Sequence, residues 1–135
     1  MAGREARPAG ASWRGGSRFL AVQAVIVQNV AAPPGPADAP VRARFGVTVG
    51  KRNARRAVER ALVKRVLREA ARHAAAALDA AAGTRSVDVV LRLKAPCPPK
   101  TTLAPPLFKR ALRAEADALL AQLARALRAG AQEPT

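Results

Sequence analysis

The chain has 135 residues, and 24 Lys and Arg against nine Asp and Glu give it a formal net charge of +15 at pH 7. This length fits one domain, a composition that is 50% hydrophobic argues against a chain disordered throughout, and a single cysteine, Cys97, excludes an internal disulfide. No apolar run is long enough to cross a bilayer, so the positive charge favours a soluble partner that is itself a polyanion.

The first part of the chain predicts a basic arm followed by two strands. Residues 1–17 are mainly Gly, Ala and Arg without an apolar period, and we expect a flexible arm there. Branched apolar residues favour a strand over 18–30, and four prolines place a loop at 31–40. Residues 42–50 alternate between apolar and polar side chains, which is typical of a half-buried strand.

The second part predicts two helices separated by a strand. A segment from about 55 to 82 is free of Gly and Pro and rich in Ala and Leu, which favours a long helix. SVDVVLRL at 86–93 predicts a third strand, and an amphipathic helix is expected over about 107–127, closed by Gly130. The order predicts an α+β fold: a two-layer sandwich in which a small sheet carries a crossover helix and a C-terminal helix.

The predicted helix over 55–82 separates apolar from basic residues. On a wheel of about 100° per residue, the apolar side chains share one half and are expected to form core: Val58, Leu62, Val63, Val66, Leu67 and Ala70. The basic side chains fill the other half: Arg60, Lys64, Arg65, Arg68 and Arg72. Because four of them recur every four residues, they repel one another by a few tenths of a kcal/mol per pair. A partner that supplies negative charge explains such a stripe best.

The positive charge is also concentrated along the chain. Residues 42–72 contain eleven Lys and Arg and two Glu, so +9 of the +15 lies there. Phosphates suit such a segment, since the Arg fork binds them with two hydrogen bonds. No helix-turn-helix, zinc-ligand set or aromatic ladder is visible, which favours contact with the backbone of a folded RNA over base reading. A solvated basic face is the simplest alternative.

The stretch FGVTVGKRNARRAVERALVKRVLREAARH at 45–73 resembles the signature segment of the bacterial ribonuclease P protein family. That family has a strand ending in two basic residues, followed by a spaced basic series. The matching residues here are Lys51-Arg52, Ala57-Val58, Arg60, Lys64-Arg65, Arg68-Glu69 and, in the next strand, Asp88-Val89-Val90. Two departures are Ala61 and Leu62, where the family has Asn and Arg, and the family's first helix has no counterpart in the helix-poor start of this chain.

The resemblance implies an RNA-binding subunit that helps a catalytic RNA remove the 5′ leader from precursor transfer RNA. It implies Mg²⁺ held by the RNA, no cofactor bound by the protein alone and one protein per RNA. We expect a cytoplasmic location, because prolines and glycines at the start of the chain argue against the amphipathic helix of a transit peptide. The residues expected to bind the catalytic RNA are Lys51, Arg52, Arg55, Arg56, Arg60, Lys64, Arg65, Arg68 and Arg72. The residues expected to contact the leader are Phe19, Arg42, Arg44 and Phe45. The expected organisation is a single RNA-binding domain over 18–129, between the basic arm 1–17 and a tail 130–135.

The side chains themselves favour no catalytic or metal site in the protein. A protein ribonuclease needs paired histidines or clustered carboxylates. His73 is the one histidine, Cys97 has no second histidine to activate it, and the acidic residues are scattered. Two alternatives stay open on charge alone: a ribosomal-type structural RNA-binding protein without enzymatic role, and a nucleoid-associated DNA-binding protein. The spaced basic series favours the ribonuclease P subunit.

Overall fold

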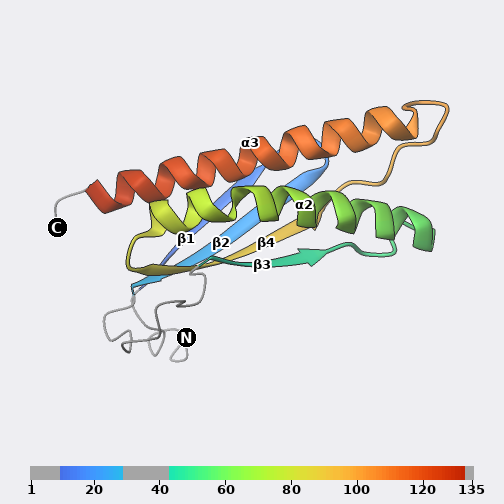
Figure 1. The fold of residues 1–135 in the computed structure, drawn as a ribbon. Coiled ribbons are helices and arrows are strands. Elements are labelled where there is room, and N and C mark those ends of the chain that lie inside the picture. Colours follow the sequence, from blue (N-terminus) through green and yellow to red (C-terminus); the bar gives the residue numbers. More distant parts are fainter. Residues whose placement is uncertain (1–9, 29–42, 133–135) are drawn as a thin grey trace, which may run out of the picture.

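The computed structural model describes residues 10–28 and 43–132, which form two layers: a sheet and a pair of helices on one of its faces (Figure 1). The strands are β1 (Gly10–Gly16), β2 (Leu20–Gln28), β3 (Ala43–Thr48) and β4 (Arg85–Leu93). The helices are α2 (Ala57–Ala82) and α3 (Pro105–Gln132), which pack against each other along their length. The predicted α+β sandwich is confirmed.

The four strands run in the order β1-β2-β4-β3. β1 pairs with β2 and β2 with β4 in antiparallel fashion, whereas β3 lies parallel to β4. A parallel neighbour needs a crossover connection, and α2 provides it. The end of β3 and the start of α2 therefore come together at one end of the molecule, which is where the basic segment lies (Figure 1).

The core lies between the sheet and the helices. Strand residues that face the helices alternate with exposed ones, and the buried residues of β4 show this most clearly: Val87, Val89, Leu91 and Leu93. The helices contribute apolar residues at intervals of three and four: Val63, Val66, Leu67, Ala70 and Leu78 from α2, and Leu112, Leu119, Leu120, Leu123 and Leu127 from α3. This core covers one face of the sheet and leaves the other open.

The prediction of a flexible arm over 1–17 is wrong for residues 10–16, which form β1. Their backbone pairs with β2 from Gly10 opposite Val27 to Gly16 opposite Ala21. The half-buried Trp13 packs against the core, and Gly15 makes room for it, since a Cβ there would lie 2.6 Å from the indole ring. Residues 1–9 and the predicted loop at 31–40 lie outside the described residues.

Two details of the helices also differ from the predictions. Val58, placed in the core by the helical wheel, is 63% exposed because it lies at the edge of a surface groove on the first turn of α2. α3 begins at Pro105, where a proline without an amide hydrogen is tolerated. It also continues past Gly130 to Gln132, since one exposed glycine weakens a helix by about 1 kcal/mol without ending it.

Candidate RNA-binding surface

The turn between β3 and α2 is fixed to the end of β4. The side-chain amide of Asn53 donates a hydrogen bond to the carbonyl of Leu93 at 3.0 Å, and the carbonyl of Asn53 accepts one from the amide of Cys97 at 2.8 Å. Lys51 and Arg52 lie in the same turn with exposed side chains. Their charges are therefore presented from a defined backbone position.

The start of α2 is held by its own side chains. The amide of Arg56, the N-cap residue, donates to the carboxylate of Glu59 at 3.2 Å, and an acidic group in the first turn also complements the helix dipole. One guanidinium nitrogen of Arg60 donates to the carbonyls of Ala54 at 3.0 Å and Arg55 at 2.9 Å. Arg60 thus ties the helix to the preceding turn, a role that the helical wheel did not indicate.

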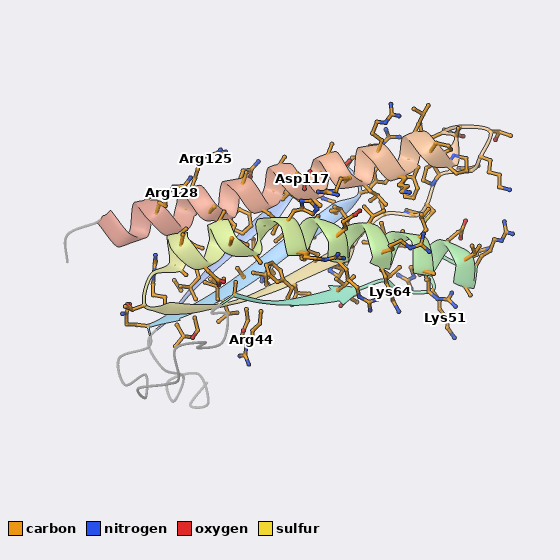
Figure 2. All side chains as sticks on the ribbon, viewed as in Figure 1. Arg44, Lys51, Lys64, Asp117, Arg125 and Arg128 are labelled. Carbon is orange, nitrogen blue, oxygen red and sulfur yellow. The ribbon has the colours of Figure 1, made fainter. Side chains whose placement is uncertain are left out.

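The next two turns of α2 carry cations with no such role. Within the described chain, no hydrogen bond or ion pair is found for the side chains of Lys64, Arg65, Arg68 and Arg72. Three of these side chains are exposed and that of Lys64 is half-buried. Figure 2 shows Lys64 toward the same end of the molecule as Lys51.

The acidic residues near these cations are already engaged. Glu69 accepts an ion pair from Arg113 of α3 at 3.3 Å, and Arg113 also binds Asp117 at 3.0 Å, one turn along its own helix. Glu59 is used at the N-cap. The positive charge of α2 is therefore available to a partner. We define the basic surface as the nine predicted RNA-binding residues, which the turn and α2 bring together: Lys51, Arg52, Arg55, Arg56, Arg60, Lys64, Arg65, Arg68 and Arg72.

The residues predicted to contact the leader do not form one site. Phe19 is 3% exposed and packs edge-to-face on Phe108, with ring centroids 5.1 Å apart, so it is a core residue and the prediction is wrong for its side chain. Phe45 is half-buried against the core on the helix-facing side of β3. Arg44 is exposed on the opposite face, and Arg42 lies outside the described residues.

The open face of the sheet is a surface that the sequence analysis missed. Arg44 forms an ion pair with Asp88 across β3 and β4, with a nitrogen–oxygen distance of 2.9 Å, and this hydrogen bond raises the pKa of Arg44. One row of the face crosses all four strands in register: Arg14, Gln23, Val90 and Gly46. Val90 is 42% exposed, and no side chain at Gly46 covers it. The signal was present in the alternation of the strands, whose polar positions mark this face.

Two further carboxylates have structural roles, and the cysteine is partly buried. The carboxylate of Asp79 accepts from the amide of Ala43 at 2.8 Å, and Glu115 accepts from the hydroxyl of Ser17 and the amide of Phe19. Burial raises the pKa of the Cys97 thiol, and the charge of Glu59 raises it further.

No group of three or more His, Cys, Asp or Glu residues described here could hold a metal ion. Neither of the described helices is long and apolar enough to span a membrane.

A model of the ribonuclease P family matches residues 13–104. The ribonuclease P protein components of Bordetella parapertussis and Bordetella bronchiseptica are each 44% identical over 96 residues, which cover 70% of this chain and 71% of theirs. That of Bordetella avium is 43% identical over 88 residues, 65% of this chain and 66% of its own. Among solved structures, the B subunit of the Myxococcus xanthus DNA gyrase has a TM-score of 0.28 and 18% identity over 95% of this chain and 40% of that chain, which is too low to carry an argument. The family match spans the sheet from Trp13 onward, α2 and the basic surface, and the chain therefore belongs to the ribonuclease P protein family.

Proposed function

We propose that the basic surface binds the catalytic RNA of ribonuclease P and that the chain thereby assists removal of the 5′ leader from precursor transfer RNA. Membership of the family makes this chain an RNA-binding subunit in transfer RNA processing. The observation that carries the assignment of the surface is the row of unpaired cations on α2 beside the anchored turn with Lys51 and Arg52. Phosphates of a folded RNA fit such a row.

The chemical step is proposed to belong to the RNA. Mg²⁺ requires several oxygen ligands, and the described carboxylates are already engaged in contacts within the fold: Glu59, Asp79 and Glu115 with backbone amides, Asp88 with Arg44, and Glu69 and Asp117 with Arg113. This donor set does not fit a metal held by the protein alone. The protein's contribution is then positive charge that stabilises the folded RNA and its substrate complex.

The leader is proposed to lie on the open face of the sheet. Arg14, Arg92 and Arg44 are exposed on that face around Val25 and Val90. Because Asp88 already neutralises Arg44, the other two arginines are expected to contribute more to a phosphate contact. This placement replaces the earlier assignment to two phenylalanines, both of which belong to the helix-facing side.

Reconstitution tests the proposed function directly. We expect the purified protein alone to leave precursor transfer RNA intact and to restore cleavage by a bacterial ribonuclease P RNA at a low Mg²⁺ concentration. One protein per RNA is expected, since a chain with +15 repels a second copy. Cleavage at the 5′ site by nuclease-treated, RNA-free protein would contradict the proposal. For the leader, an Arg14→Ala, Arg92→Ala variant should weaken binding of precursor but not of mature transfer RNA by the holoenzyme.

A further inference from the structure

An apolar groove lies beside the basic surface. It runs between the first turns of α2, the segment that follows β4 and the start of α3, and its volume is about 410 Å³. Its apolar lining comes from all three elements: Val58, Leu62, Cys97, Leu103 and Phe108. Val58 is 63% exposed. Contact of this apolar side chain with water is unfavourable, and burial against a partner would stabilise it. The groove thus presents apolar surface within a highly charged region.

The rim of this groove is basic. Arg56, Arg65 and Lys100 line it together with one acidic residue, Glu59, whose carboxylate is engaged by the N-cap amide. The groove also shares Arg65 with a hollow that contains Lys64 and Arg68, and it shares Arg56 with a second hollow that contains Arg52 and Arg55. It therefore lies within the basic surface, with cations on both sides.

The described ends of the chain lie far from this groove. The described residues next to the gaps, Gly10, Gln28 and Ala43, lie at the opposite end of the sheet, where Gln28 pairs with Arg85, and α3 ends on the same side (Figure 1). β4 separates the two ends by roughly 25 Å at 3.3 Å per residue. A segment of 14 residues would have to be fully extended in both directions to reach the groove and return, and three residues are too short to reach it. Residues 1–9 carry Arg4 and Arg7 against Glu5, a charge that the rim repels.

A second copy of the chain is also a poor occupant, because two molecules of +15 would meet at surfaces of the same sign. A polyanion with apolar parts fits both the rim and the lining. RNA has this character: its phosphates are anionic, and the faces of an unpaired base are flat and apolar. The groove's volume lies at the lower end of the range of roughly 300–1,000 Å³ seen for small-molecule sites, which suits one nucleotide and excludes a duplex.

We infer that this groove holds one unpaired nucleobase of the ribonuclease P RNA, with the phosphates on either side of that base contacting the basic rim. The inference rests on the proposed function and deepens it, because it adds a site for a base to a surface otherwise suited to phosphates. Single-stranded RNA is commonly bound in this way, with a base against apolar side chains and its backbone in a basic channel.

The groove is preformed, which reduces the entropy cost of binding. The amide of Cys97 donates to Asn53 at 2.8 Å, and the amide of Leu103 donates to the carbonyl of Pro99 at 3.0 Å. Phe108 is held by its contact with Phe19 in the core. Each wall of the groove is thus attached to the folded domain.

The first test separates a base contact from a phosphate contact. Val58→Asn changes no charge and alters a side chain that is mostly exposed, so folding should be unaffected. We expect it to weaken binding to the catalytic RNA about tenfold, within the range for the loss of one base contact, with an unchanged dependence on salt. Leu107→Asn is the matched control, because Leu107 is 50% exposed at the same end of the molecule but does not line the groove. Val58→Asn binding within twofold of wild type, or with a reduced salt slope, overturns the inference.

The second test uses the chain's one cysteine as a reporter inside the groove. Bound catalytic RNA should slow alkylation of Cys97 by iodoacetamide at least tenfold. Heparin, a polyanion without bases, should leave the rate within twofold of that of the free protein. Equal protection by heparin would mean that only the rim is covered. Protection that rises with protein concentration in the absence of RNA would identify a second copy as the occupant. Either result overturns the inference.

Failure of this inference differs from failure of the proposed function. If the wild-type protein restores cleavage and Val58→Asn binds like wild type, the groove is empty in the complex while the function stands. If the wild-type protein neither binds the catalytic RNA nor restores cleavage, both the proposed function and this inference are wrong.

Discussion

Removal of two cations from the middle of α2 should weaken RNA binding and stabilise the fold at the same time. The perturbation is a Lys64→Ala, Arg68→Ala variant. Neither side chain has a hydrogen bond or ion pair within the described chain, and both lie on the side of α2 that faces away from the core. Their loss therefore removes charge from the surface without opening a cavity.

The expected magnitudes follow from these positions. Each lost phosphate contact at an exposed site costs about 1 kcal/mol, below the range for charge-assisted hydrogen bonds, so two cost about 2 kcal/mol or roughly thirtyfold in affinity. The salt slope should fall by about two. The substitutions also remove three like-charge neighbours four residues apart, between Arg60 and Arg72, each unfavourable by about 0.2–0.5 kcal/mol. The free energy of unfolding should therefore rise by roughly 1 kcal/mol.

Filter binding to the catalytic RNA across a range of KCl concentrations measures the affinity and the slope. Urea denaturation followed by circular dichroism measures the stability. An Arg125→Ala, Arg128→Ala variant is the matched control, since it removes the same charge from the far half of α3, where Figure 2 shows both residues pointing away from α2. The reasoning is refuted if the α2 variant binds within threefold of wild type, if the control lowers the slope equally, or if the α2 variant is less stable than wild type.

Three further predictions concern the same end of the molecule. Arg60→Ala should lower the free energy of unfolding by about 1 kcal/mol, measured in urea, because two backbone carbonyls lose their charged donor; unchanged stability would show that these bonds contribute nothing. An Arg55→Ala, Arg56→Ala variant should bind the catalytic RNA on the order of a hundredfold more weakly, with partial rescue by Ala61→Asn, and binding within threefold of wild type contradicts this. Since burial raises the pKa of Cys97, its alkylation at pH 8 should be slower than in the urea-unfolded chain, and the difference should shrink as pH rises. The raised pKa also stabilises the folded chain at pH values below the ordinary pKa of a thiol, and this stabilisation is lost as the pH rises through the pKa of the folded state. Equal alkylation rates in the folded and unfolded chains would show that the pKa is not shifted.

The parts of the fold that were predicted correctly are those with one strong period. β4 alternates buried and exposed residues from Val87 to Leu93, and α2 separates buried apolar residues from basic ones between Arg60 and Arg72. The positive charge of α2 and its place on the helix followed from that separation. Helical periodicity alone predicts which side chains face outward, without knowledge of the rest of the fold.

The features that were not predicted from the sequence depend on contacts between segments that are distant in the chain. β1 has almost no large side chains, and its strand structure comes from pairing with β2 and from the packing of Trp13 over Gly15. A helical wheel cannot tell where the covering element ends, so Val58 was placed in the core. The same wheel placed Arg60 on the RNA-binding side, whereas its guanidinium turns back to the preceding turn. Alternation within each strand marks the polar positions of the open face, but which of these positions become neighbours depends on the strand order β1-β2-β4-β3, which no local pattern contains.

That strand order also determines when a nascent chain can fold. β4 is an inner strand of the sheet, yet it lies late in the sequence, and both β2 and β3 pair with it, with Leu20 opposite Leu93 at one end. During synthesis, β1, β2, β3 and α2 all leave the ribosome before the strand that joins them. Until β4 emerges, the apolar side of α2 has no sheet to cover and only the β1–β2 hairpin can pair. Folding is therefore governed by contacts of long sequence separation, which are slow to form, and we expect the domain to become protease-resistant only once β4 and α3 have been released.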